Sequence, residues 1–296
     1  MKNYTNIATV TSFFALWLVS FFSANYQIIA GFVLILTFGI LHGANDLELL
    51  DKIIIQKNNT STFRVPIYYV LFILIGVVLF YLLPLLALIT FILVSSYHFG
   101  EQQWQNLPNT IKSWLIHLYQ FLSGIMILLL IFVFHKHQVQ DIIFIITHYK
   151  IPLEFFSTLL IVFGVIFICL STYFYAKAKL QRSEILMQFG RLIIFTIIFK
   201  SSSLIWGFAI YFVIWHSIPS TIDQIKFLHG SVSRGHFKMY CKKAGLNWFM
   251  SVISVGILYL FFREEQVFNA IFFSFLAAVT FPHALVITRM LQKKSS

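Results

Sequence analysis

The sequence predicts an all-α fold, a polytopic bundle of transmembrane helices. Of its 296 residues, 59% are hydrophobic and only 10% are charged, whereas about 25% of the residues in a typical soluble domain are charged. Apolar runs long enough to cross a bilayer, roughly 17 to 25 residues each, recur along the chain. No fixed-period repeat, low-complexity tract or Pro/Gly-rich linker interrupts it, so we expect residues 1–296 to form a single transmembrane domain.

Taken in order, the apolar runs predict about ten transmembrane helices, with a range of eight to ten. The first run lacks a small-residue cleavage pattern, so we interpret it as a retained helix and not as a signal peptide. Pro84 separates the third span from the fourth, and Arg191 lies within the seventh. The expected spans are residues 7–22, 27–45, 66–83, 84–100, 114–134, 155–175, 186–200, 203–220, 246–262 and 267–290.

The basic residues between the spans predict the orientation, because Lys and Arg collect in the cytoplasmic loops of membrane proteins. With the N-terminus inside, 16 of the 21 Lys and Arg fall in cytoplasmic loops and tails and four fall outside. We therefore expect both termini in the cytoplasm, in a multi-pass protein of the cell inner (cytoplasmic) membrane. The net charge of +11 is explained by this topology, and no nucleic-acid partner is expected.

Four of the ten histidines occur in apolar helices, where an ionisable residue is costly and usually points into the bundle. In the predicted topology they lie on the second, fourth, eighth and tenth spans, all toward the cytoplasmic end, so their imidazoles can converge on one buried layer. Taken singly, each could instead be a hydrogen-bonded packing histidine. The four are His42 in LHGAND, His98 in SSYHFGEQQW, His216 in IWHSIPS and His283 in TFPHALVITRM.

Imidazole is a natural ligand for Fe, Zn or Cu, and the two cysteines, Cys169 and Cys241, have no C-x-x-C spacing that would suggest a thiolate site. The remaining histidines are expected outside this layer. His117 lies near the start of the fifth span and suits an interfacial role. Polar loops hold the other five, for which a solvated surface position is expected: His135, His137, His148, His229 and His236.

Two carboxylates accompany the buried histidines. Asp46 lies one turn after His42, and Glu101 lies three residues after His98, so each is expected to share a helical face with its histidine. Real metal sites usually have such acceptors behind the ligand rings, so Asp46 and Glu101 are candidates for accepting a hydrogen bond from a ligand histidine and holding its ring in place. The alternative is that both are helix-end charges at the membrane interface.

These motifs resemble the Brp/Blh family of membrane β-carotene 15,15′-dioxygenases. The resemblance rests on four short segments in order across most of the chain: HGANDLELL at 42–50, YHFGE at 97–101, WHSIPS at 215–220 and FPH at 281–283. It implies Fe(2+) bound by His42, His98 and His216, with His283 as the expected fourth ligand. Some members carry a further histidine where this chain has Ser220, so His283 or a water would complete the site here.

The resemblance also implies the reaction: cleavage of the central double bond of β-carotene with O₂, giving two all-trans-retinal. Retinal then implies a rhodopsin as its consumer. An apolar C40 polyene dissolves in the lipid bilayer, which fits an enzyme built of membrane helices. Because the histidine layer lies toward the cytoplasmic side of the spans, we expect a lateral tunnel that opens to lipid and lets the polyene lie roughly along the membrane plane.

Other functional classes stay open at this point. A membrane di-iron desaturase or hydroxylase needs clustered HxxxH and HxxHH boxes, and the sequence has none. A haem-binding electron-transfer protein could use His42 with His98, or His216 with His283, as axial pairs. A transporter could use the buried histidines as a proton relay.

Overall fold

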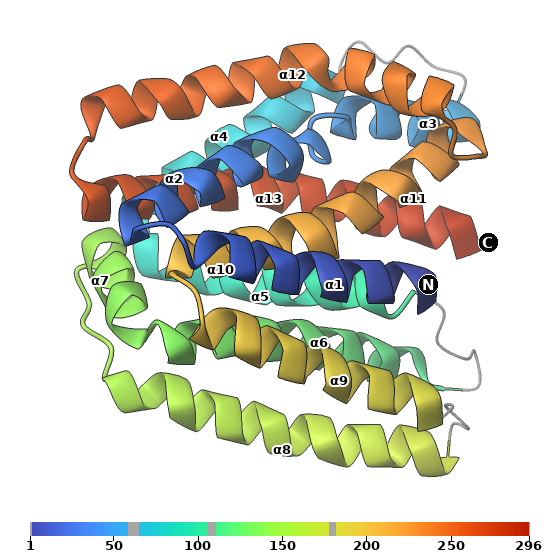
Figure 1. Cartoon of the computed structure of the whole chain (residues 1–296). Coiled ribbons are helices and arrows are strands. Elements are labelled where there is room, and N and C mark those ends of the chain that lie inside the picture. Colours follow the sequence, from blue (N-terminus) through green and yellow to red (C-terminus); the bar gives the residue numbers. More distant parts are fainter. Residues whose placement is uncertain (1, 59–64, 106–110, 178–181, 296) are drawn as a thin grey trace. The chain divides into compact units, whose positions relative to one another are not determined.

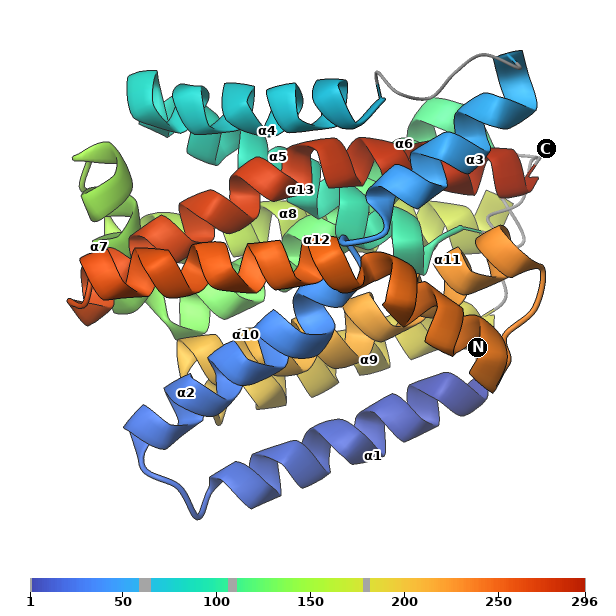
Figure 2. The same cartoon turned by 90° about the horizontal axis from the view of Figure 1, so that it is seen from above.

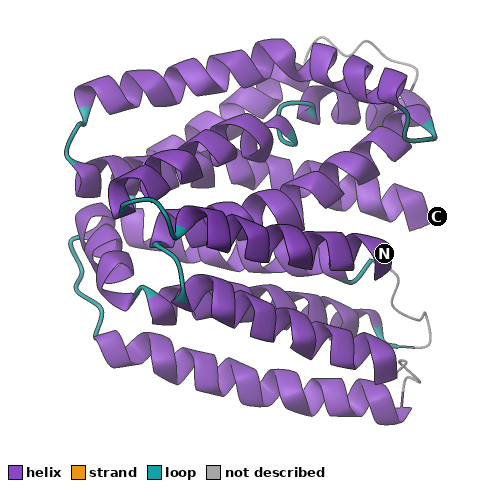
Figure 3. Ribbon diagram, viewed as in Figure 1, coloured by secondary structure: helices purple, strands orange, loops and turns teal. Residues whose placement is uncertain are grey.

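The computed structural model describes residues 2–58, 65–105, 111–177 and 182–295, and in these residues it contains helices and no strand (Figures 1 and 3). This confirms the predicted all-α class. Packing divides the chain into two compact units. Unit 1 comprises Met1–Leu34, Ile92–Gln140 and Lys150–His216, and unit 2 comprises Ile35–Phe91, Asp141–Tyr149 and Ser217–Ser296.

Within the described residues, seven helical segments are long and apolar enough to cross a membrane. Two further apolar helices, Tyr4–Val19 and Ala24–Gly39, are shorter. The predicted span at 186–200 is also helical and belongs to α9 (Arg182–Lys200), which carries Arg191. The number of crossings and the orientation remain predictions. The seven segments are α4 (Val65–Leu82), α5 (Pro84–Gln103), α6 (Ser113–Phe134), α8 (Leu153–Lys177), the continuous run of α10 (Leu204–Ile210), η3 (Tyr211–Ser217) and α11 (Ile218–His229), α12 (Arg234–Phe261) and α13 (Glu265–Ser295).

Two π-helical segments precede or contain candidate ligands. The segment η1 (Ile35–Gly39) continues α2 (Ala24–Leu34), and η3 continues α10. Regular helix then ends before His42, because residues 42–45 form turns with short-range bonds such as Gly43 N–H to the Ile40 carbonyl, 3.1 Å. The helix predicted over 27–45 is therefore shorter than expected, and α3 (Asp46–Asn58) starts a new direction. Single π-helical turns are frequent at functional sites.

In unit 1, α6 packs against α8 and α9, and aromatic side chains contribute to its contact with α8. The ring of Tyr119 on α6 stacks on Phe167 of α8, with centroids 5.2 Å apart and planes 11° from parallel. The Tyr119 hydroxyl also lies 3.2 Å from the Ser171 hydroxyl, so a buried phenol keeps a hydrogen-bond partner. These contacts fix α6, on which α5 packs in turn.

The crossing of α5 and α6 depends on two glycines. A Cβ added to Gly100 would lie 1.6 Å from the Gln120 carbonyl oxygen, and one added to Gly124 would lie 1.8 Å from that of Ser96. Only a residue without a side chain lets the two backbones come this close, as in other membrane helix pairs. The close approach places the end of α5, which carries His98, against α6.

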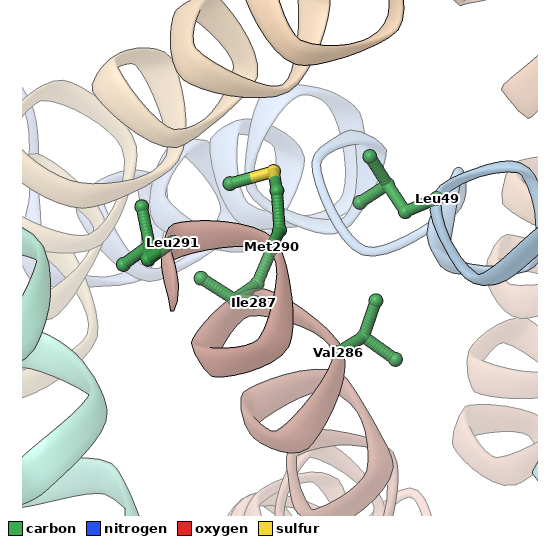
Figure 4. Packing of buried hydrophobic residues seen from close by; sticks show 5 residues of the cluster. All are labelled: Leu49, Val286, Ile287, Met290 and Leu291. Carbon is green, nitrogen blue, oxygen red and sulfur yellow. The ribbon is translucent and has the colours of Figure 1, made fainter. Parts of the chain in front are cut away.

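In unit 2, α13 packs against α4 and α3 (Figure 2). Gly76 of α4 lies directly against the backbone of Ala278 on α13, where an added Cβ would be 3.2 Å from its Cα. Near the end of α13 a cluster of buried apolar side chains joins it to α3 (Figure 4): Leu49, Val286, Ile287, Met290 and Leu291. The contacts hold the start of α3, and so Asp46, beside the segment of α13 that carries His283.

The contacts of helices α1 and α11 and the place of α7 complete this description. In unit 1, α1 (Lys2–Val19) packs against α9, and the indole N–H of Trp215 in η3 donates to the Ser12 hydroxyl of α1 at 2.9 Å. Between the two long helices α6 and α8 the chain forms the short α7 (Lys136–Thr147). In unit 2, α11 contacts α3 and α12, and the Lys52 ammonium donates to the carbonyls of Phe227 and Leu228 at 2.7 Å each.

Candidate metal centre

His42 lies in the turn after η1 with its ring held by the backbone. It is buried, and its Nδ1 is hydrogen-bonded to the Gly39 carbonyl oxygen. A carbonyl oxygen can only accept, so the proton of the neutral ring is on Nδ1 and the lone pair is on Nε2. Ring orientation by a backbone carbonyl is a common feature of metal-binding histidines.

Tyr240 of α12 stabilises the turn that contains His42 through hydrogen bonds. Its hydroxyl donates to Gln224 Oε1 at 2.7 Å and lies 3.3 Å from the His42 carbonyl oxygen. Its own carbonyl oxygen accepts from the Asn45 side chain at 3.0 Å. Tyr240 is buried and far from His42 in sequence, so this contact could not be read from any local motif.

Two more side chains of α12 satisfy carbonyl groups that the break in the helix leaves open. The Asn247 amide donates to the Ala44 carbonyl at 2.9 Å, and the Trp248 indole donates to the Leu36 carbonyl at 2.8 Å. Irregular backbone at membrane depth is tolerated only where other groups replace the missing helical bonds. The irregular segment around His42 is thus a defined structure and not a loose loop.

His283, on α13, is held by a carboxylate. Its Nδ1 lies 2.9 and 3.0 Å from the two carboxylate oxygens of Asp46, and the Tyr69 hydroxyl donates to the same carboxylate at 2.6 Å. Because a carboxylate accepts, Nδ1 carries the proton and Nε2 keeps its lone pair. The rings of His283 and His42 lie 4.7 Å apart at 84°, so unit 2 holds a buried histidine pair.

The expected position of Asp46 on one helical face with His42 needs a correction. We expected it to share a helical face with His42, but residues 42–45 form turns, so the two are not on one helix. The carboxylate instead contacts His283, which is 237 positions away in sequence. Asp46 is buried, which argues against the alternative of a solvated charge at a helix end.

Unit 1 holds the second buried pair. The rings of His98 on α5 and His216 on η3 lie 4.8 Å apart at 77°. Phe99 and Phe212 flank the His216 ring with centroids 4.7 and 5.6 Å away. The Gln102 amide donates to the His216 carbonyl at 3.0 Å and so ties η3 to α5.

Glu101 is buried on α5, three residues after His98 and on the same helix, as predicted. Its carboxylate accepts a 3.3 Å bond from the Tyr97 hydroxyl, which also lies 2.9 Å from His117 Nδ1. His117 is itself exposed, which fits an interfacial position. Whether Glu101 also orients a ligand ring stays a prediction.

The other residues singled out in the sequence lie elsewhere. Ser220, buried on α11, accepts a 3.1 Å bond from the Gln224 amide and so belongs to the Tyr240 network. Two of the loop histidines, His137 and His148, are exposed as expected. The remaining three are half-buried: His135, His229 and His236. Burial lowers the pKa of His135, with a hydrogen bond to the Phe199 backbone opposing the shift.

All four predicted ligands are buried, each with 5% or less of its surface exposed. Each unit therefore brings two buried imidazoles together as candidate metal ligands. In unit 2 the proton of both rings is on Nδ1, so Nε2 is the nitrogen that would coordinate a metal ion. The residues present therefore fit a transition metal. Sequence reasoning did not find Tyr69 and Tyr240, since a tyrosine in an aromatic-rich membrane protein has no distinguishing pattern.

Comparison with known proteins decides the family. The family model for beta-carotene 15,15′-dioxygenase matches residues 33–291, which is most of the chain. The chain belongs to this family. No curated protein and no solved structure matches it.

Family membership agrees with the resemblance seen in the motifs. The matched stretch of the beta-carotene 15,15′-dioxygenase family begins just before η1 and ends within α13. It therefore includes both buried histidine pairs, Asp46 and Tyr69. Only α1 and most of α2 precede it. The family supports assignment of the chain as a carotene dioxygenase in a membrane setting.

Proposed function

We propose that this chain binds one Fe(2+) through His42, His98, His216 and His283 and cleaves β-carotene at its central 15,15′ double bond. Both oxygen atoms of O₂ enter the products, one on each carbon of the broken bond, so two retinal molecules form and no outside reductant is needed. We further propose that the protein lies in the cytoplasmic membrane and passes its all-trans-retinal to a rhodopsin.

The observation that supports this most directly is the set of four buried imidazoles in a chain of this family. A neutral set of histidine ligands suits Fe(2+), and with four ligands positions remain open for O₂. When bound, the iron would supply the O₂ activation that an organic side chain cannot provide. Two of the rings already have Nδ1 held by an acceptor, which presents Nε2 without further reorganisation.

The protein contributes a dry and rigid surrounding. Phe99 and Phe212 lie against His216, and all four imidazoles are shielded from solvent. Excluding water protects reactive oxygen species from side reactions and suits a substrate that has no polar atom. Hydrogen bonds from the side chains of Tyr240 and Gln102 reach the backbone carbonyls of His42 and His216 and hold these two ligand-bearing segments in place.

Expression in a bacterium that makes β-carotene tests the activity. We expect loss of the orange colour and retinal in the extract, and about one iron per chain in the purified protein. A haem protein would show an intense Soret band, and a histidine-relay transporter would show ion flux without metal.

The decisive variant is His98→Ala, which should lose both iron and cleavage. Removal of exposed His137 in the same way is the matched control and should change neither. Size-exclusion chromatography of both variants checks that they remain folded. Normal iron content and retinal yield in His98→Ala would overturn the proposal.

A further inference from the structure

Unit 2 has an apolar groove between η1 and α12, which we name the η1–α12 groove. It is open along one side and has a volume of about 620 Å³, within the range of roughly 300 to 1,000 Å³ that is usual for small-molecule sites. Its side chains are apolar apart from one hydroxyl, one thiol and one indole N–H. The lining residues are Thr37, Phe38, Leu41, Cys241, Gly245, Leu246, Trp248 and Phe249.

The chemistry of the walls suits a ligand without polar atoms. Phe38, Leu246 and Phe249 are exposed over 52%, 72% and 55% of their surface, so the rim of the groove is largely exposed carbon. The one polar atom of Trp248 is already used, because its indole N–H donates to the Leu36 carbonyl at 2.8 Å. The groove therefore presents aromatic ring faces and few polar groups, so a ligand without hydrogen-bonding atoms suits it.

The groove adjoins the segment that carries a predicted metal ligand. Leu41 lines it, and the next residue is His42. On the other wall, Gly245 and Trp248 flank Asn247, whose amide donates to the Ala44 carbonyl at 2.9 Å. A ligand in the groove would thus contact both the η1 end and the α12 segment that together hold the His42 turn.

We propose that the η1–α12 groove binds one end of the carotene substrate as it arrives from the lipid. This rests on the proposed function and adds where the hydrocarbon is first held. Phospholipid acyl chains are the competing occupant, since they share the apolar chemistry. Three aromatic side chains among the eight lining residues favour a flat conjugated polyene, whose π-system can stack on them, over a saturated chain.

The two cysteines of the chain make a direct binding test possible. Cys241 lines the groove and is half-buried, while Cys169 is exposed on α8 in unit 1 and serves as the internal control. The full-length protein in phospholipid nanodiscs is labelled with a maleimide, and the modification of each cysteine is followed by mass spectrometry. With β-carotene at about ten times its Kd, labelling of Cys241 should slow roughly tenfold and that of Cys169 should not change.

Saturated squalane at the same concentration separates the two possible occupants. It should protect Cys241 little, because it cannot stack on the aromatic walls. Equal protection by squalane, or no protection by β-carotene, would overturn the proposal. The test needs no catalysis, so it remains informative even if the protein cleaves no carotene and the proposed function itself fails.

Two glycines of α12 give matched variants for a kinetic test. A Cβ added at Gly245 or at Gly256 meets no heavy atom within 4 Å, so a side chain can begin at either position without a backbone clash. Only Gly245 lines the groove. Gly245→Leu should raise KM for β-carotene about tenfold, the loss of roughly 1.4 kcal/mol of uniform binding, while kcat and iron content stay unchanged. The Gly256→Leu control should behave like the wild type, and an unchanged KM in Gly245→Leu would count against the groove.

Discussion

At the scale of single residues, the most informative group is the chain of contacts from Tyr69 through Asp46 to His283. The phenol donates at 2.6 Å to the carboxylate, which accepts from the ring at 2.9 and 3.0 Å. Two donors together satisfy a carboxylate that is almost fully buried. The role of such a chain at a metal site is to hold the ligand ring in one tautomer and one orientation.

This arrangement predicts the effect of removing either partner. Asp46→Ala should lower iron affinity roughly 10- to 100-fold, as is typical when the acceptor behind a ligand histidine is lost. Tyr69→Phe leaves the carboxylate in place and should cost less, roughly tenfold, the order of one hydrogen bond to a charged group. Iron content after dialysis against graded chelator measures both, and the absorption bands of the Co(II)-substituted protein report the ligand geometry.

Tyr68→Phe is the matched control, because Tyr68 is the neighbouring phenol and is 64% exposed. It should bind iron like the wild type. If Tyr69→Phe kept both the wild-type affinity and the wild-type Co(II) spectrum, the phenol would have only a packing role.

At the scale of elements, two departures from regular helix set the positions of the ligands. The π-helical η3 contains His216, and the break after η1 contains His42. The close crossing of α5 and α6 does the same for His98, because Gly100 and Gly124 let the backbones meet. Helix position, and not only helix formation, therefore decides where these imidazoles lie.

The α5–α6 crossing gives a stability prediction. Gly124→Leu places a side chain where the Ser96 carbonyl oxygen now lies, so the helices must separate, at a cost of about 3 kcal/mol or more. Thermal unfolding in detergent should show a lower Tm and a smaller iron content. Gly190→Leu on α9 is the control, since an added Cβ there meets no heavy atom within 4 Å. A wild-type Tm for Gly124→Leu would contradict the close packing described for this pair.

At the scale of the whole molecule, each of the two compact units contains one buried histidine pair. A single iron held by all four residues predicts that removing either pair empties the protein of metal. We expect near-zero iron in both the His42→Ala/His283→Ala and the His98→Ala/His216→Ala double variants. Two independent sites would instead leave about half of the metal in each, which inductively coupled plasma mass spectrometry would detect.

Much of this protein could be predicted from its sequence. Composition and apolar run length predicted an all-helical membrane protein, because a bilayer requires long apolar helices with internally satisfied backbones. The order of four short motifs predicted the family. Burial of His42, His98, His216 and His283 followed from the cost of an ionisable residue within an apolar helix. Each of these inferences depends on local composition, which a sequence displays directly.

Only the tertiary structure decided which distant residues contact the candidate ligands and their segments. Asp46 contacts His283, because the helix breaks at residues 42–45 and α13 packs beside α3. Tyr240 and Trp248 satisfy the backbone of a segment about 200 positions away. Such contacts depend on where helices end and how they cross, which follows from the packing of whole surfaces. Periodicity shows that a helix has an apolar face, but it does not show which distant helix that face will meet.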